Sequence, residues 1–332
     1  YAREDIKAAD GESDDYYKKD ELVATIKTDE LGIARTDDLP LGKYYVVEKE
    51  TADGFVLDGE PRDIDLTYRD QDTPVVTFDS EWQNSRQKAK VIVTKKEKDS
   101  DRVLEGGVFA LCAKEDIKNA DGDVLVKADT IIEQKATDKD GKIFFTADLP
   151  VGGSFYVKEV KAPAGFVTTE EVKEFTFEYA GADAPEVTFE HTFENEATIF
   201  EITKSDLTTG VELDGATLTV LDKDENEIDK WTSVKGEPHI IKRLHVGETY
   251  ILREEFAPYG YLKAEEVEFT ITDTAEIQKV EMKDDVPIGR IIINKKGEFL
   301  SEVTWNDMVA GAMDSIWGYV TGSLKDVTFE IY

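Results

Sequence analysis

Cysteine, histidine and long hydrophobic runs are all scarce in this sequence of 332 residues. The single cysteine, Cys112, excludes an internal disulfide and any cysteine-based metal site. Three histidines leave little material for a zinc site, so we expect neither a metal nor any other cofactor. No apolar run approaches the roughly 20 residues that a membrane helix needs, so we expect no membrane insertion in this segment.

Positive charge is also in deficit. Forty Lys and Arg residues stand against 73 Asp and Glu residues, which gives a formal net charge of −33. Such a surface repels nucleic acid and anionic lipid, so neither is an expected partner. A hydrophobic content of 40% is enough to fill cores, which argues against a disordered acidic protein. The sequence starts at Tyr1 without an initiator Met or a signal peptide, and is therefore expected to be a processed or excised segment.

What the sequence has instead is an internal repeat. Most stretches alternate apolar and polar residues, are rich in Val, Ile, Thr, Phe and Tyr, and are separated by Asp, Gly and Pro. This pattern predicts tandem all-β domains of roughly 90–110 residues. The recurring segments are the lysine stretches VIVTKKEKD (91–99), FEITKSD (200–206) and IIINKKGE (291–298), the turns LPLG (39–42), LPVG (149–152) and LHVG (244–247), and the closing stretches VTFDSEWQN (76–84), VTFEHTFEN (187–195) and QKVEMKD (278–284).

The repeat is out of phase with the ends of the sequence. We expect two complete domains, 88–197 and 198–287, preceded by a domain at 1–87 that lacks its first strand. Residues 288–332 hold the first strands of a further domain. Two interpretations remain open: the protein is a fragment of a longer array, or residues 288–332 complete 1–87, within one molecule or head-to-tail between molecules. An unpaired half-sandwich exposes strand edges, so some complement is expected.

Three strand-like stretches end in a glutamate on their apolar face. Side chains two apart on a strand share a face, so Glu48, Glu159 and Glu254 each follow two large hydrophobic residues toward the interior. The same period places a lysine on the inner face of each lysine stretch and Asn or Asp on the inner face of each closing stretch. These residues are Lys95, Lys204 and Lys295, and Asn84, Asn195 and Asp284, with Asp285 as an alternative register for Asp284.

A buried amine, carboxyl and amide can react with one another. Desolvation favours the neutral amine of lysine, which is a nucleophile, and the neutral acid of glutamate, which can polarise a carbonyl and shuttle protons. Amine and amide held in attack geometry gain an effective molarity on the order of 10⁵ M or more. The expected product is an isopeptide bond between Lys and Asn with loss of ammonia, or between Lys and Asp with loss of water. The alternative is that these are rim residues whose charged ends reach solvent.

The motif that follows each glutamate resembles that of a known family. The runs Glu159–Phe166 (EVKAPAGF) and Glu254–Tyr261 (EEFAPYGY), together with the K-x-[DE] and closing N/D motifs, resemble the Cna B-type, or Spa-type pilin, domains of Gram-positive surface proteins. Glu48–Phe55 (EKETADGF) departs from the motif at the Ala-Pro pair. The resemblance covers nearly the whole sequence and implies Greek-key β-sandwiches of the immunoglobulin-like or prealbumin-like type.

The resemblance also implies which residues bond. Lys95, Glu159 and Asn195 would form one set and Lys204, Glu254 and Asp284 a second, with the glutamate catalytic in each. Lys295, Glu48 and Asn84 would form a third set only if the two ends meet. Each site would act once on itself, so the protein is not expected to be a turnover enzyme.

The sequence therefore predicts a stalk or shaft segment of an extracellular, cell-wall-anchored bacterial adhesin or pilin. Its expected partners are the neighbouring domains of the same surface protein, and head-to-tail self-association is a further possibility. The alternative function is a ligand-binding adhesin module that recognises a host protein or glycan, through the acidic surface or through the insert 299–324 with Trp305, Trp317 and Tyr319. At most a turn or two of helix is expected, near 304–317.

Overall fold

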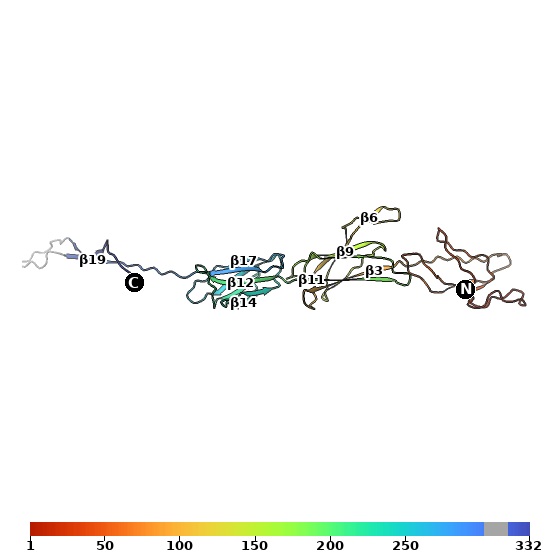
Figure 1. The fold of residues 1–332 in the computed structure, drawn as a ribbon, viewed down its shortest axis with the longest axis horizontal. Helices are drawn as coiled ribbons and strands as arrows, with labels where there is room; N and C mark the ends of the chain where they lie inside the picture. Colours follow the sequence, from red (N-terminus) through yellow and green to blue (C-terminus); the bar gives the residue numbers. More distant parts are fainter. Residues whose placement is uncertain (302–317) are drawn as a thin grey trace, which may run out of the picture.

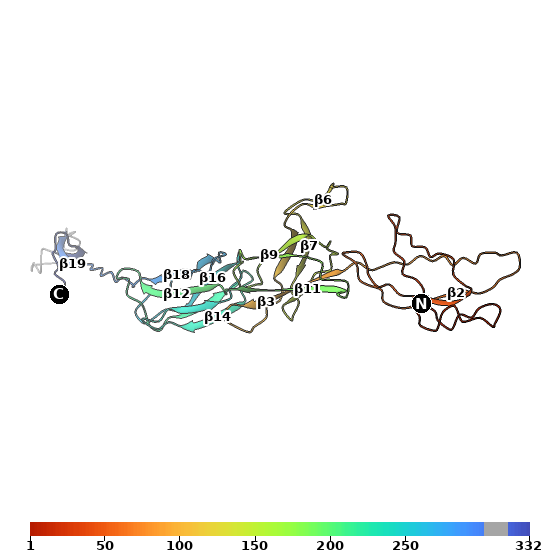
Figure 2. The same ribbon diagram turned by 45° about the vertical axis from the view of Figure 1, so that its right-hand side comes forward.

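The computed structural model describes residues 1–301 and 318–332. The described residues form strands and no helix, which confirms the all-β prediction, and none of them forms a helix that could cross a membrane. The protein is an elongated rod in which successive units lie end to end (Figures 1 and 2). We call residues 1–87, 88–197 and 198–287 the first, second and third units, and residues 288–332 the tail. The expected helical turn near 304–317, Trp305 and Trp317 lie outside the described residues.

The second unit packs a three-stranded sheet against a four-stranded sheet. The strand order is β11-β3-β8 in one and β10-β9-β4-β7 in the other, and the small hairpin β5-β6 projects from the side (Figure 1). Both sheets contribute to one core of buried hydrophobic side chains. The strands are β3 (Lys88–Glu97), β4 (Val108–Ala113), β5 (Ile117–Lys118), β6 (Val124–Val126), β7 (Ile131–Ala136), β8 (Lys142–Phe144), β9 (Ser154–Lys161), β10 (Val172–Thr176) and β11 (Glu186–Asn195).

The third unit repeats this arrangement. One sheet has the order β15-β12-β18 and the other β14-β13-β16-β17, around a second hydrophobic core. Its strands are β12 (Ile199–Asp206), β13 (Thr217–Leu221), β14 (Glu227–Thr232), β15 (His239–Lys242), β16 (Thr249–Phe256), β17 (Val267–Thr270) and β18 (Gln278–Asp284).

The first and last strands of each complete unit are parallel neighbours. β3 pairs with β11, with Lys95 opposite Phe193, and β12 pairs with β18, with Lys204 opposite Met282. Parallel strands run in the same direction. The backbone therefore enters a unit at one end and leaves it at the other, which is why consecutive units form a rod.

The first unit is less complete. It has one two-stranded sheet, β1 (Gly42–Val46) with β2 (Arg62–Leu66), and Ala2 forms an isolated bridge to Tyr44. Its core contains three buried hydrophobic residues, whereas the second and third units contain eleven and twelve. The strand expected at 76–84 does not form: the segment contacts its neighbours through the side chains of Trp82 and Asn84, and its backbone pairs with no other described segment.

The tail extends beyond the third unit (Figure 1). It carries the hairpin β19 (Lys296–Ser301) with β20 (Gly318–Ser323). The strand expected at 291–295 belongs to no sheet, and its three isoleucines are exposed, at 67%, 75% and 49% for Ile291, Ile292 and Ile293.

The junction between the second and third units is built on the turn that follows Glu159. Gly165 O accepts a hydrogen bond from Thr198 N at 3.1 Å, and Arg243 Nη2 reaches Glu97 with contacts of 2.9 and 3.0 Å. Gly165 has φ +82°, and a Cβ there would lie 2.6 Å from Arg243 O. Close backbone approach and positive φ both require glycine at this position.

The junction between the first and second units uses the corresponding turn. Tyr179 Oη donates to Phe55 O at 3.0 Å, and Leu57 N donates to Ala182 O at 3.0 Å. The turns after Glu48 and Glu159 thus contact the next unit as well as supporting their own.

Candidate functional site

Three strands of the second unit bring a lysine, a glutamate and an asparagine together in its core. Lys95 comes from β3, Glu159 from β9 and Asn195 from β11. Lys95 Nζ lies 3.3 Å from Glu159 Oε1, and Asn195 Nδ2 donates to Glu159 Oε2 at 2.8 Å. The side chains of Lys95 and Glu159 are both fully shielded from solvent. One carboxylate therefore touches the amine with one oxygen and the amide with the other.

This cluster is not fully satisfied by hydrogen bonds. Lys95 Nζ, Glu159 Oε1 and Asn195 Oδ1 are buried atoms without a hydrogen-bond partner, and the Lys95–Glu159 contact is an ion pair without hydrogen-bond geometry. Burial lowers the pKa of Lys95, and the nearby charge of Glu159 opposes that effect only in part. The Phe109 ring, 5.6 Å from Lys95 Nζ, adds to the apolar surroundings. Unsatisfied buried polar groups are costly, and in a native protein they mark sites of chemistry or strain.

The third unit holds an equivalent cluster with an aspartate in place of the asparagine. Lys204 Nζ lies 3.1 Å from Glu254 Oε1 and also contacts Asp284 Oδ1. All three side chains are buried. Burial raises the pKa of Asp284, and the charge of Glu254 raises it further against the opposing effect of Lys204. Asp284 occupies the inward position, whereas Asp285 is exposed, so the register with Asp284 is the one observed.

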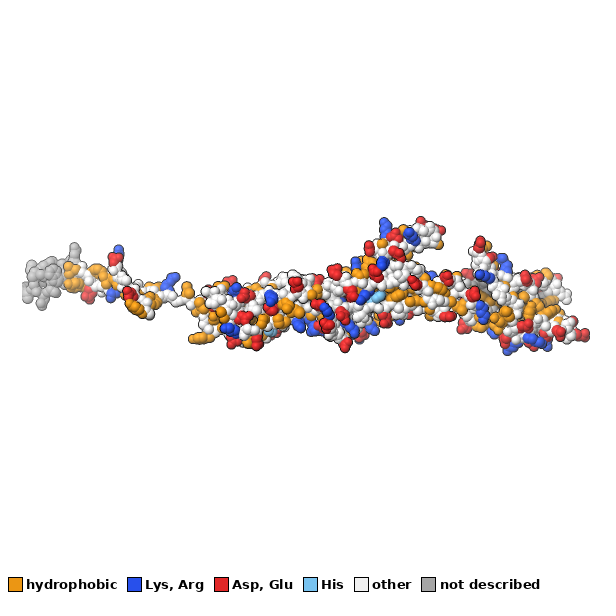
Figure 3. Space-filling model, in the orientation of Figure 1, with side chains coloured by type: hydrophobic (Ala, Val, Ile, Leu, Met, Phe, Trp, Pro, Cys, Tyr) orange, Lys and Arg blue, Asp and Glu red, His pale blue; other side chains and the backbone are white. Residues whose placement is uncertain are grey.

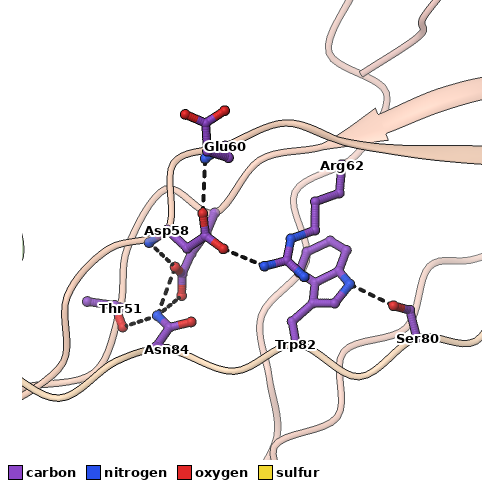
Figure 4. A network of polar contacts seen from close by, with 8 residues as sticks. Thr51, Asp58, Glu60, Arg62, Ser80, Trp82 and Asn84 are labelled. Atoms are coloured by element: carbon purple, nitrogen blue, oxygen red, sulfur yellow. Dashed lines mark hydrogen bonds and ion pairs between the residues drawn. The ribbon is translucent and has the colours of Figure 1, made fainter.

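The first unit contains two members of such a cluster. Asn84 Nδ2 donates to both oxygens of Glu48, at 2.8 and 2.9 Å, and to Thr51 Oγ1 at 2.7 Å (Figure 4). Both side chains are half-buried. Among the described residues the Glu48 carboxylate accepts hydrogen bonds from Asp58 N and Asn84 Nδ2, and it pairs with no lysine. Lys295, the third member that the sequence suggested, is exposed in the tail at the opposite end of the rod, and the structure does not bring it to Glu48 within one molecule (Figures 1 and 2).

A backbone contact that the sequence analysis missed holds each glutamate in place. The amide nitrogen ten residues further on donates to Oε2 of the glutamate in all three units. These contacts are Asp58 N to Glu48 at 2.8 Å, Thr169 N to Glu159 at 2.8 Å, and Ala264 N to Glu254 at 2.7 Å. The turn after the glutamate returns the backbone to that glutamate's own carboxylate, and the constant length of the turn is the signal that could have revealed the contact.

A metal site is not among the features of these clusters. The residues that the structure describes contain no group of three or more His, Cys, Asp or Glu side chains arranged to hold a metal ion. The cluster of the second unit pairs Lys95 with the carboxyl of Glu159, and that of the third unit pairs Lys204 with the carboxyls of Glu254 and Asp284.

The regions of the sequence that match a known protein family correspond to the three units. The family model of the SpaA prealbumin-like fold domain matches residues 7–82, 89–192 and 198–286. No curated protein matches the sequence. Among solved structures, the Bacillus anthracis TIE protein is 27% identical, with a TM-score of 0.50, over 78% of this protein and 45% of that one. The present sequence therefore spans less than half the length of that structure.

Two pilin structures also match, at lower identity and with TM-scores below 0.5. A streptococcal ancillary pilin is 24% identical over 75% of this protein and 76% of its own length, with a TM-score of 0.29. The shaft pilin spaA from Lactobacillus rhamnosus GG is 15% identical over 62% of this protein and 99% of its own length, with a TM-score of 0.27. The family match covers most of the sequence and agrees with the resemblance to Spa-type pilin domains. The protein belongs to the family of SpaA prealbumin-like fold domains.

Proposed function

We propose that this protein is a shaft or stalk segment of an extracellular bacterial surface protein, and that its second and third units cross-link themselves through isopeptide bonds. The bonds join Lys95 to Asn195 and Lys204 to Asp284. Glu159 and Glu254 catalyse them. The observation that carries the proposal is the buried contact of one carboxylate with both the amine and the amide in the second unit.

The geometry supports a proton path in the second unit. Lys95 passes a proton to Glu159 Oε1, and the neutral amine attacks Cγ of Asn195. Glu159 then returns a proton through Oε2 to Nδ2, which lies 2.8 Å away. The C–N bond of the Asn195 carboxamide breaks, ammonia leaves, and the remaining amine proton passes to Glu159, which ends neutral. The lowered pKa of Lys95 favours the nucleophilic form of the amine.

In the third unit the leaving group is water. An amine attacks a neutral acid but not a carboxylate, and the raised pKa of Asp284 favours that neutral acid. Lys204 gives its proton to Glu254, and the neutral amine attacks Cγ of Asp284. Glu254 returns that proton to a hydroxyl of the tetrahedral centre, the C–O bond breaks and water leaves. The remaining amine proton passes to Glu254, which ends neutral. The net change is one amide bond formed and one water lost.

The bond would serve a mechanical purpose. It joins the first strand of a unit to its last, so the tension on the rod passes through the bond and bypasses the strands between. Closing a loop of about 100 residues also stabilises the fold by about 4 to 5 kcal/mol in the loop-entropy picture. Unlike a disulfide, such an isopeptide bond needs no cysteine and no oxidising compartment. Each site acts once, so the protein is a structural component rather than a turnover enzyme.

Intact mass spectrometry tests the proposal. The mass of the purified protein should fall short of the sum of its residues by one ammonia and one water. Glu159→Ala should restore the ammonia and leave the water loss unchanged, because the two clusters lie in separate cores. Glu194→Gln, an exposed change one residue from Asn195, is the matched control and should retain both losses. A mass equal to the unmodified sum would refute the cross-links.

Binding to a host protein or glycan is the second hypothesis from the sequence. Most of the insert on which it rests, 299–324, lies outside the described residues, and no described contact favours a ligand there. We therefore leave it as an untested prediction.

A further inference from the structure

A short segment of the second unit contacts both the reacting cluster and the third unit. Its residues, 167–169, follow the turn after Glu159 and are half-buried; we call them the strap. The second and third units form one continuous body where they meet (Figures 1 and 3). A cleft at this junction is lined by the three strap residues, by Asn195 and by Ala275 of the third unit. The strap therefore lies between the cluster and the neighbouring unit.

Two contacts of the strap fix the groups that react. Thr169 N donates to Glu159 Oε2 at 2.8 Å, while the other oxygen of that carboxylate faces Lys95. Val167 O accepts a hydrogen bond from Asn195 Nδ2, which also donates to Glu159 Oε2. The strap thus sets the rotation of both the carboxylate and the carboxamide before they react. Misplacing reacting groups by about 1 Å can cost on the order of 100-fold in rate.

The middle residue of the strap is held by the third unit. Thr168 N donates to Asp273 Oδ1 at 2.9 Å, although the two residues lie 105 apart in the sequence. Asp273 belongs to the loop between β17 and β18, which is braced by a hydrogen bond of 2.9 Å from Thr272 N to Gln278 Oε1. Because the acceptor is a carboxylate, the hydrogen bond to Thr168 is stronger than one between neutral groups. The third unit therefore anchors the strap between its two contacts with the cluster.

The junction between the first and second units repeats this arrangement with different residues. Three consecutive amide nitrogens again donate in turn to the last segment of their own unit, to the next unit and to the inward glutamate. These hydrogen bonds run from Val56 N to Ser85 O at 2.9 Å, from Leu57 N to Ala182 O at 3.0 Å and from Asp58 N to Glu48 Oε2 at 2.8 Å. Ala182 lies in the loop between β10 and β11, as Asp273 lies between β17 and β18. An acceptor in this loop of the next unit is common to both junctions.

We infer that Asp273 is a positioning residue for the bond of the second unit, because it holds Thr168 and thereby the strap that orients Glu159 and Asn195. The inference rests on the proposed cross-link and adds a dependence between units. A second unit without a docked third unit leaves the middle of its strap unanchored and reacts slowly. The bond therefore closes in a unit that is already seated against its neighbour.

Rates of bond formation in newly made protein test the role of Asp273. The full-length protein is made by cell-free synthesis during a short isotopic pulse, and samples are denatured and digested at intervals. Mass spectrometry follows two linked peptides separately, one holding Lys95 and Asn195 and the other Lys204 and Asp284. Asp273→Ala should slow the appearance of the first by roughly tenfold, as expected for one lost hydrogen bond. The second should appear at an unchanged rate, because Asp273 precedes β18 and Asp284 lies at its far end.

Two further variants separate the hydrogen bond from charge. Asp273→Asn keeps a side-chain oxygen that accepts from Thr168 N, and it should restore the rate of the unaltered protein. Glu276→Ala removes a negative charge from the same exposed loop, and it should also react at the unaltered rate. Slowing in Glu276→Ala equal to that in Asp273→Ala would overturn the inference. Equal slowing of both linked peptides in Asp273→Ala would overturn it too, because that result reports a damaged third unit.

Hydrogen exchange tests the anchoring of the strap without any bond. Lys95→Met removes the amine, so the second unit cannot cross-link. In that background Asp273→Ala should raise the exchange rates of the Thr168 and Thr169 amides by roughly tenfold, and Asp273→Asn should not. Unchanged exchange rates would overturn the positioning role.

The outcomes keep this inference distinct from the proposed function. An unaltered protein that yields neither linked peptide would refute the cross-links and the inference together. An unaltered protein that yields both, with Asp273→Ala forming the first at full rate, would refute the inference alone.

Discussion

Asn195 and Glu159 meet in the core of the second unit through a hydrogen bond of 2.8 Å between Nδ2 and Oε2. The bond joins β11, the last strand, to β9 in the facing sheet, and Lys95 from the first strand reaches the other oxygen of the same carboxylate. Amine, carboxyl and amide therefore converge from three strands on a point that water does not reach.

Pulling the protein from its ends should reveal whether the second unit is stapled. With a bond between Lys95 and Asn195, the residues between them are shielded from tension and cannot extend. In Glu159→Ala the bond does not form, so the residues between Lys95 and Asn195 can extend under force. The unit should then lengthen by roughly 330–360 Å for about 100 released residues. Single-molecule force extension measures this step. The control Glu194→Gln should show no extension step of this length. The same step in the unaltered protein would contradict a bond between Lys95 and Asn195.

Asp284→Asn should leave the mass of the cross-linked protein unchanged. The amide formed from Asn by loss of ammonia is identical to the one formed from Asp by loss of water. If the bond forms in both proteins, their intact masses coincide. If it forms in neither, the masses differ by the exchange of a hydroxyl for an amino group, which high-resolution mass spectrometry resolves.

Lys204→Met should make the stability of the third unit depend on acid pH. The substitution removes the amine and leaves two buried carboxyls, Glu254 and Asp284. Burial already raises the pKa of Asp284 above its ordinary value of 3.8, and loss of the Lys204 charge raises it further. The folded state then holds a proton that the unfolded state has released. The stability of the variant is therefore present below about pH 4 and falls as pH rises through the folded pKa, by up to about 1.4 kcal/mol per pH unit.

Urea unfolding between pH 4 and pH 7 tests this sign. Adding Asp284→Asn to Lys204→Met removes the titrating acid and should flatten the dependence. A third unit whose stability rises with pH over this range in Lys204→Met would contradict the assignment of Asp284 as the group with the raised pKa.

Gly165→Ala should loosen the junction between the second and third units. A Cβ at this position would lie 2.6 Å from Arg243 O, so the two units must move apart. The amide of Thr198, which donates to Gly165 O at 3.1 Å, should then exchange its hydrogen faster. Gly260→Ala carries the same positive-φ strain, of about 1 to 2 kcal/mol, but meets no neighbour within 4 Å, and it should leave the Thr198 exchange rate unchanged. Equal rates in both variants would show that the contact does not hold the junction.

The local alternation of residues in the sequence determined the strands and which of their side chains point into the core. Strand side chains alternate with a period of two, so the inward positions of Lys95, Glu159 and Asn195 could be read directly, and likewise Lys204, Glu254 and Asp284. The choice between Asp284 and Asp285 was left open by the pattern, because a shift of one residue changes the face, and the parallel pairing of β12 with β18 decided it.

Only the tertiary structure showed which backbone groups contact the site and which strand-like segments have no partner. The amide of Thr169 reaches Glu159 because a turn folds back, and the contact between Gly165 and Arg243 joins two units, so neither leaves a local period in the sequence. The segments 76–84 and 291–295 have the sequence of strands but belong to no sheet. A strand needs a neighbouring strand that accepts and donates its backbone hydrogen bonds. The sequence of a segment sets its preference for the extended conformation, but the fold decides whether a neighbouring strand is present.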